Sequence, residues 1–211
     1  MAPNDPASPL GPPAPAKPLA PGSPDLRTRI LREATRLLAE RGYGGTSIRE
    51  VVEAAGCTKP ALYYHFGSKE GLFLACIRAH TDLFTQMLER SVQGPASMGS
   101  MLEGLRSFLD HVRSHPTGIQ LLWRAEMHPD RGQPAFDFES VRSQHIAMLE
   151  DRLRHARDAG EIRRDVDLKD ATYALVGMID QRLDLWVRGG GDLPQDLPER
   201  LLGLFIRGVA P

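Results

Sequence analysis

The chain has 211 residues, of which 41% are hydrophobic and 25% charged, and its formal net charge is −1. This composition is typical of a soluble globular protein with a core, in one or two domains. It excludes a polycation, so any nucleic-acid affinity must come from a local patch, and no apolar run reaches the ~18 residues of a membrane span.

The N-terminal segment is rich in proline and alanine. The first 24 residues hold nine of the 17 prolines and lack the apolar run of a signal peptide. The composition predicts a disordered tail over residues 1–23, and the functional alternative is a docking arm for a partner.

Apolar residues at helical spacing begin directly after this tail. Gly42 is the expected stop of the first helix, and Ser47 with Glu50 has the spacing of a capping box that begins the second. Thr58 can cap a third helix, which Gly67 ends, and a longer fourth helix follows. The four predicted ranges are 25–42, 47–56, 58–66 and 68–93.

The second and third helices are short and are joined by a turn that contains a glycine, which is the pattern of a helix-turn-helix over residues 47–66. At 100° per residue, Leu62 and Phe66 share the inner face of the third helix, whereas Pro60, Ala61 and Tyr64 point outward. An exposed proline, methyl group and aromatic ring suit a DNA major groove better than bare solvent. The alternative is that the aromatic residues belong to the core and the lysines to a solvated face.

The remainder of the chain also has a helical period. Five further helices are predicted, over 98–115, 118–128, 135–160, 168–188 and 198–210. No alternating run is long enough for a sheet, so the predicted fold is all-α with about nine helices.

Residues 24–84 resemble the DNA-binding domain of the TetR family of bacterial transcriptional regulators. The segment "RILREATRLLAERGYGGTSIREVVEAAGCTKPALYYHFGSKEGLF" carries this resemblance without a gap. It implies an all-helical homodimer whose third helix reads DNA and whose C-terminal domain binds an unidentified small molecule, which is expected to release the DNA. The two-fold symmetry of a dimer predicts a palindromic operator. The cysteine pattern, which suggests no disulfide framework, favours a cytoplasmic location. The resemblance also implies a DNA-binding domain over 24–84, a helical ligand-binding and dimerisation domain over 85–211, and a repressor rather than an activator. The DNA-facing residues carried over from the family are Thr46, Ser47, Thr58, Lys59, Pro60, Ala61, Tyr63, Tyr64, His65 and Lys69.

The C-terminal part offers candidates for an apolar ligand pocket, although for each residue taken singly a plain core position is the commoner role. They are Phe108, Trp123, Glu126, Met127, Phe136, Tyr173 and Trp186. A four-helix dimer interface is expected from the last two helices, with the alternative that these helices only close the protomer core. Its candidates are Leu175, Met178, Leu201, Leu204 and Phe205.

Other readings rest on fewer residues. His111 and His115 have the spacing of a metal pair, but no further ligand completes a site, so no metal or cofactor is predicted. Cys57 could sense oxidation, although a buried thiol is the commoner role, and neither Cys57 nor Cys76 has disulfide spacing. No nucleophile, phosphate-loop or HExxH motif supports an enzyme. A ligand-independent DNA-binding regulator and a small helical enzyme are the alternatives to a ligand-controlled repressor.

Overall fold

The computed structural model describes residues 25–91 and 97–210, and within these ranges it contains nine α-helices and no strand. They are α1 (Leu26–Gly45), α2 (Ile48–Ala55), α3 (Lys59–Phe66), α4 (Lys69–Ser91), α5 (Met98–Ser114), α6 (Pro116–Met127), α7 (Phe138–Asp158), α8 (Leu168–Val187) and α9 (Leu197–Val209). The all-α prediction is confirmed. The predicted tail and the end of the fourth predicted helix lie outside the described residues.

Local signals explain most helix boundaries. Asp25 begins α1 by accepting the Thr28 N–H, and Ser47 and Thr58 cap α2 and α3 in the same way. α1 continues to Gly45 only across a kink, because Gly42 adopts φ 74° and interrupts the helical backbone. The glycine signal therefore marked a real break in the helix, although a further turn follows it.

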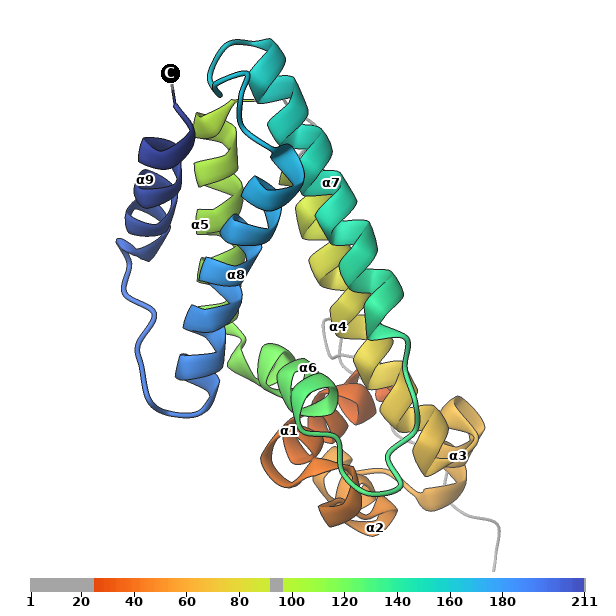
Figure 1. Cartoon of the computed structure of the whole chain (residues 1–211). Helices are drawn as coiled ribbons and strands as arrows, with labels where there is room; N and C mark the ends of the chain where they lie inside the picture. Colours follow the sequence, from red (N-terminus) through yellow and green to blue (C-terminus); the bar gives the residue numbers. More distant parts are fainter. Residues whose placement is uncertain (1–24, 92–96, 211) are drawn as a thin grey trace, which may run out of the picture.

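The helices form two groups that α4 connects (Figure 1). α1, α2 and α3 lie around the first part of α4 at one end of the molecule, and the C-terminus lies at the other end. Farther along, α4 packs against α5 and α7, while α8 and α9 pack on each other and on α7 and α5 respectively. The predicted domain division at residue 84 falls inside the continuous helix α4.

The core of the N-terminal group includes a helix from much later in the chain. Leu37, Leu62 and Ile77 are buried in it, and so are Leu121 and Leu122 of α6. α6 packs directly on α1 and on α4. The helix-turn-helix is therefore fixed to the rest of the protein through both α4 and α6.

Two further apolar clusters hold the C-terminal group together. One joins α7, α8 and α9 around Leu153, Leu175 and Leu202. The other joins α5, α6, α8 and α9 around Leu109 and Trp123. None of the helices in the described part of the chain is long and apolar enough to span a membrane.

Candidate nucleic-acid interface and effector cavity

α3 is divided into a buried face and an exposed face. Leu62 is fully buried and Phe66 is 9% exposed, both within the N-terminal core, which confirms their predicted packing. On the opposite face Tyr64 is 86% exposed, the largest value among the exposed large hydrophobic residues. Among the aromatic rings of the described residues, the Tyr64 ring contacts only that of His65, edge-on and with the two centroids 5.3 Å apart. α3 therefore presents a tyrosine to the surroundings and is anchored from behind.

The turn before α3 holds this helix at a fixed angle to α2. Gly56 takes the left-handed conformation, with φ 59°, and its N–H donates to the Glu53 carbonyl oxygen. Cys57 N–H donates to the Val52 carbonyl oxygen at 3.1 Å. A residue with a side chain would be strained at this φ, so glycine permits the tight turn of a helix-turn-helix.

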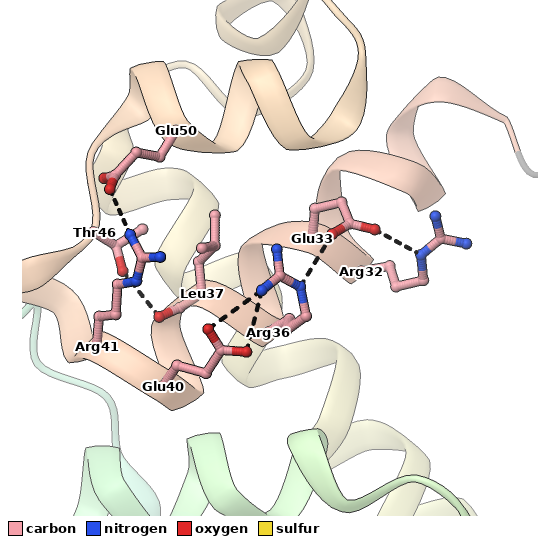
Figure 2. A network of polar contacts seen from close by, with 8 residues as sticks. All are labelled: Arg32, Glu33, Arg36, Leu37, Glu40, Arg41, Thr46 and Glu50. Carbon is pink, nitrogen blue, oxygen red and sulfur yellow. Dashed lines mark hydrogen bonds and ion pairs between the residues drawn. The ribbon is translucent and has the colours of Figure 1, made fainter.

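The start of α2 is fixed by a closed polar network. The Ser47 N–H and hydroxyl donate to Glu50 Oε2 at 2.9 and 2.7 Å, and the Glu50 N–H donates to Ser47 Oγ. These bonds hold the pKa of Glu50 below its ordinary value. Figure 2 shows that Arg41 of α1 reaches the same carboxylate and so connects α1 with α2. Ser47 can meet phosphate mainly through the exposed N-terminus of α2.

The predicted contact between the Thr46 side chain and DNA is wrong. Its side chain is 4% exposed, and its hydroxyl lies 3.1 Å from the Leu37 carbonyl oxygen and 2.8 Å from that of Gly42 (Figure 2). A hydroxyl that is buried and bonded to carbonyls within its own protein cannot also reach a phosphate. The sequence pattern missed this because it cannot distinguish a threonine that caps a helix end from one that faces DNA.

The other predicted DNA-facing side chains differ in exposure. Thr58, Lys59, Pro60 and Tyr63 are exposed, whereas Ala61 and His65 are half-buried. The Thr58 hydroxyl oxygen accepts the Ala61 N–H at 3.4 Å, so it serves as the cap of α3.

Lys69 is half-buried in the first turn of α4, where its ammonium lies 4.3 Å from the centroid of the Tyr43 ring. The Tyr43 ring stabilises this position by a cation–π contact. The lysine is thereby held at a helix N-terminus. Its positive charge and the free backbone N–H groups there both favour binding of an anion such as phosphate.

A cavity of about 270 Å³ lies among α4, α5, α6, α7 and α8. Phe108, Trp123 and Glu126, three of the predicted pocket residues, line it, and most of its other lining residues are apolar. α4 contributes Phe84, Met87 and others, so one helix reaches both the cavity and the helix-turn-helix.

Four predicted pocket residues lie elsewhere. Met127 and Tyr173 are 41% and 51% exposed and do not border the cavity. Phe136 packs on the N-terminal core, and Trp186 packs on the cluster around Leu109 and Trp123. Aromatic type alone indicated burial or contact, but not on which side of its helix each residue would fall.

The polar groups of the cavity were missed by sequence reasoning, apart from Glu126. Arg142 lies between two carboxylates, 2.8 Å from Glu126 and 2.7 Å from Asp180. Burial lowers the pKa of Arg142, but the bonds to both carboxylates outweigh it and raise the pKa above its ordinary value. Arg142 and His145 are three residues apart, so they share one face of α7, and this spacing is the one signal that could have identified them.

The predicted dimer interface also needs correction. Leu175, Leu201 and Phe205 are 3%, 8% and 5% exposed, and they belong to the core of their own protomer. The alternative reading, closure of the protomer core, therefore holds for these three, and Met178 also packs against the protomer clusters. Leu204 is 57% exposed on α9.

No metal site is formed among residues 25–91 and 97–210, since no three His, Cys, Asp or Glu side chains are placed to share an ion. His111 and His115 are stacked with ring centroids 4.6 Å apart. Cys57 and Cys76 are free thiols, and burial raises the pKa of Cys76 to about 12. A thiol with so high a pKa is unreactive at neutral pH.

Comparison with known proteins gives a consistent result. Residues 30–76 match the family model described as bacterial regulatory proteins, tetR family. The HTH-type transcriptional repressor AcnR of Corynebacterium efficiens is 31% identical over 148 residues, which cover 68% of this chain and 72% of AcnR. The repressor KstR2 of Mycobacterium tuberculosis is 26% identical over 185 residues, covering 87% of this chain and 92% of KstR2.

Solved structures have the same fold. The ketosteroid transcriptional regulator KstR2 of M. tuberculosis superimposes with a TM-score of 0.67 at 25% identity, over 88% of this chain and 95% of that one. FadR of Bacillus subtilis, solved in complex with stearoyl-CoA, superimposes with a TM-score of 0.68 at 18% identity, over 86% and 98%. These relatives are regulators of transcription and not enzymes.

Proposed function

The chain belongs to the TetR family of bacterial transcriptional regulators, and on that premise we propose that it represses transcription as a homodimer on a palindromic operator. A small molecule in the cavity among α4 to α8 releases it. The exposed face of α3 is the observation that carries this proposal. Its relatives AcnR and KstR2 bear the name of repressors, which supports repression over activation.

α3 has the composition and support that direct reading of DNA requires. Tyr64 is the most exposed large hydrophobic side chain of the helix, and Lys59 and Pro60 are exposed at its N-terminal end. The ring and the pyrrolidine can contact thymine methyl groups, while Lys59 can reach a base edge or a phosphate. Because Leu62 and Phe66 anchor the helix from behind, it can enter a groove without losing its orientation.

The assembly proposal rests on the apolar side chains that the protomer leaves exposed. On α8 these are Tyr173 and Leu185, which are 51% and 37% exposed, and on α9 it is Leu204. α8 and α9 pack against each other, so the three residues lie on neighbouring helices. We propose that the exposed apolar surface of α8 and α9, which includes Leu204, meets the same surface of a second copy, and this places two α3 helices on one duplex.

Control by a ligand follows from the length of α4. The helix carries Lys69 in its first turn, and Phe84 and Met87 line the cavity about four to five turns later. A ligand that moves this helix changes the separation of the two α3 helices, whereas half-sites on B-DNA are about 34–36 Å apart. The ligand must bind the DNA-incompetent state more tightly, and such couplings are typically about 1–3 kcal/mol.

DNA binding by variants tests the reading face. Fragments selected from genomic DNA by the protein provide the operator, and fluorescence anisotropy measures affinity. Tyr64→Ala should cost about 1–3 kcal/mol on the operator and relax base preference at one position of each half-site. Tyr64→Phe, which keeps the ring, should retain most of that affinity if the contact is apolar.

The matched control is Arg154→Ala, because Arg154 is an exposed cation on α7, outside both α3 and the surface of α8 and α9 proposed for assembly. It should leave binding unchanged, whereas Lys59→Ala should weaken it. If Tyr64→Ala and wild type bound the selected operator with equal affinity, the proposal that α3 reads the DNA sequence would be wrong.

A further inference from the structure

The ring of His145 lines the cavity, and one of its nitrogens is committed to a neighbour. Nε2 lies 2.8 Å from Thr85 Oγ1, which belongs to α4. Thr85 does not border the cavity. Nε2 is therefore turned toward Thr85, outside the cavity lining, and the rest of the His145 ring supplies its contact with the cavity.

The hydrogen bonds of Thr85 determine the tautomer of His145. The Thr85 hydroxyl is 3.0 Å from the Thr81 carbonyl oxygen, which can only accept. Its single proton thus goes to Thr81, and Thr85 Oγ1 must accept the proton of His145 Nε2. The reverse assignment would place two lone pairs 3.0 Å apart. Both contacts are attractive only when Nε2 carries the hydrogen.

Nδ1 of a neutral imidazole with a protonated Nε2 is a hydrogen-bond acceptor. Burial, followed by the charge of Arg142, lowers the pKa of His145 and keeps the ring neutral at neutral pH. Among the described residues none donates a hydrogen bond to Nδ1. The cavity thus contains an acceptor that a ligand can satisfy, and a buried acceptor left alone is unfavourable.

The charged groups of the cavity do not call for a charged ligand. Glu126 and Asp180 are both paired with Arg142, so a ligand carboxylate would have to displace one of them. Arg152, the other cation of the lining, donates to Ser100 Oγ at 2.6 Å. In this mainly apolar space a charged ligand would lose its hydration and would have to compete with these existing contacts for a partner.

We propose that the effector is an uncharged, mainly apolar molecule that carries a hydroxyl group and donates its proton to His145 Nδ1. This inference rests on the proposed function of the cavity as the effector site. The cavity of about 270 Å³ has room for a small organic molecule. A medium-length aliphatic or cyclic alcohol has this size and chemistry.

Four probes of equal chain length test the chemical class: octanol, the corresponding methyl ketone, octanoate and octylammonium. Calorimetry on the full-length protein at about pH 8, above the ordinary histidine pKa, measures binding. The alcohol should bind about three- to tenfold more tightly than the ketone, the range of one hydrogen bond, and both ions should bind more weakly than the alcohol. Tighter binding of the ketone or of either ion, or no measurable binding of all four, would overturn the proposal.

Variants of Thr85 test the tautomer without touching the cavity wall. Thr85→Val removes the hydroxyl that fixes the His145 proton on Nε2, so the preference for alcohol over ketone should fall to less than about twofold. Thr85→Ser retains the hydroxyl and should retain the preference. If both variants keep the full preference, the hydrogen-bond argument is wrong.

His145→Phe provides a second test that does not depend on the folding of Thr85→Val. The phenyl ring keeps the planar shape of the imidazole, but it has no hydrogen-bond acceptor at the position of Nδ1. Octanol should lose its advantage, and the ketone should bind as it does to wild type; an unchanged advantage of octanol would refute the role of Nδ1.

Adding each probe to the protein–operator complex separates this inference from the proposed function. Alcohol binding without loss of DNA affinity would refute control through the cavity but leave the ligand class intact. Release of DNA by the ketone or an ion, and not by the alcohol, would support control and refute the ligand class.

Discussion

Gly118→Ala should destabilise the protein, although the same exchange normally stabilises a helix. Gly118 is buried in the first turn of α6, against His80 of α4. An added Cβ would lie 2.6 Å from His80 Nδ1 and 2.8 Å from Cε1, where ordinary contacts begin at 3.4 Å. The ring would have to retreat by about 0.8 Å, or α6 would have to move away from α4.

The His80 ring cannot retreat freely. Its Nε2 lies 3.3 Å from the hydroxyl of the buried Thr35 on α1, so a shift of this size can break that hydrogen bond. Overpacking costs about 1–3 kcal/mol, and a lost hydrogen bond costs about 0.5–1.5 kcal/mol. The gain in helix propensity offsets up to about 1 kcal/mol. We expect a net loss of about 1–2 kcal/mol in the free energy of unfolding.

Urea unfolding at one fixed protein concentration measures this loss, because the stability of an assembling protein depends on concentration. Gly99→Ala is the matched control: Gly99 also lies in a first turn, that of α5, and its Cβ would meet only Ser97 Oγ at 3.6 Å. The control should be as stable as wild type or more so. A Gly118→Ala protein at least as stable as wild type would refute the idea that α1, α4 and α6 meet at a rigid contact.

Three other predictions concern assembly, DNA and pH. Leu204→Glu should yield a folded monomer in light scattering, whereas Leu201→Glu, which places a charge in the protomer core, should unfold the chain; a dimeric Leu204→Glu would exclude the proposed face. Lys69→Ala should weaken binding to all duplexes alike and reduce the salt slope by about one, and an unchanged slope would remove its phosphate contact. Burial lowers the pKa of His80 and His111 from 6.5, so the unfolded state binds more protons below that pH and stability should fall as the pH is lowered from about 6.5 to 5. Urea unfolding between pH 6.5 and 5 measures this change. A free energy of unfolding that stays constant or rises as the pH is lowered would contradict the burial of these rings.

The fold could be predicted in detail because its boundaries depend on local chemistry. Ser47, Thr58 and Gly56 act within three or four residues of themselves, as caps and as a left-handed turn. The outward face of α3 followed from helical geometry, since a short helix with Leu62 inside must place Tyr64 outside. None of these inferences needed knowledge of distant contacts.

The cavity and the interface depend on how the helices pack, and there prediction failed in part. Phe136 and Phe108 have the same side chain, yet one packs on the N-terminal core and the other lines the cavity. Leu201 and Leu204 lie on the same helix, with 8% and 57% exposure. The sequence pattern defines an apolar face, but the partner of that face is determined by tertiary packing.

The placement of α6 has a consequence for synthesis on the ribosome. Leu121, Leu122 and Ala125 complete the apolar cluster around α1 and α4, yet α4 already ends at Ser91. At a translation rate of ~5–20 residues per second, roughly 2–7 s pass between the synthesis of the end of α4 and that of the last of these side chains. During that interval the face of α1 that will meet α6 is open to solvent. We therefore expect the nascent chain to expose an apolar helix face that chaperones can bind, and slow codons between α4 and α6 would lengthen its exposure.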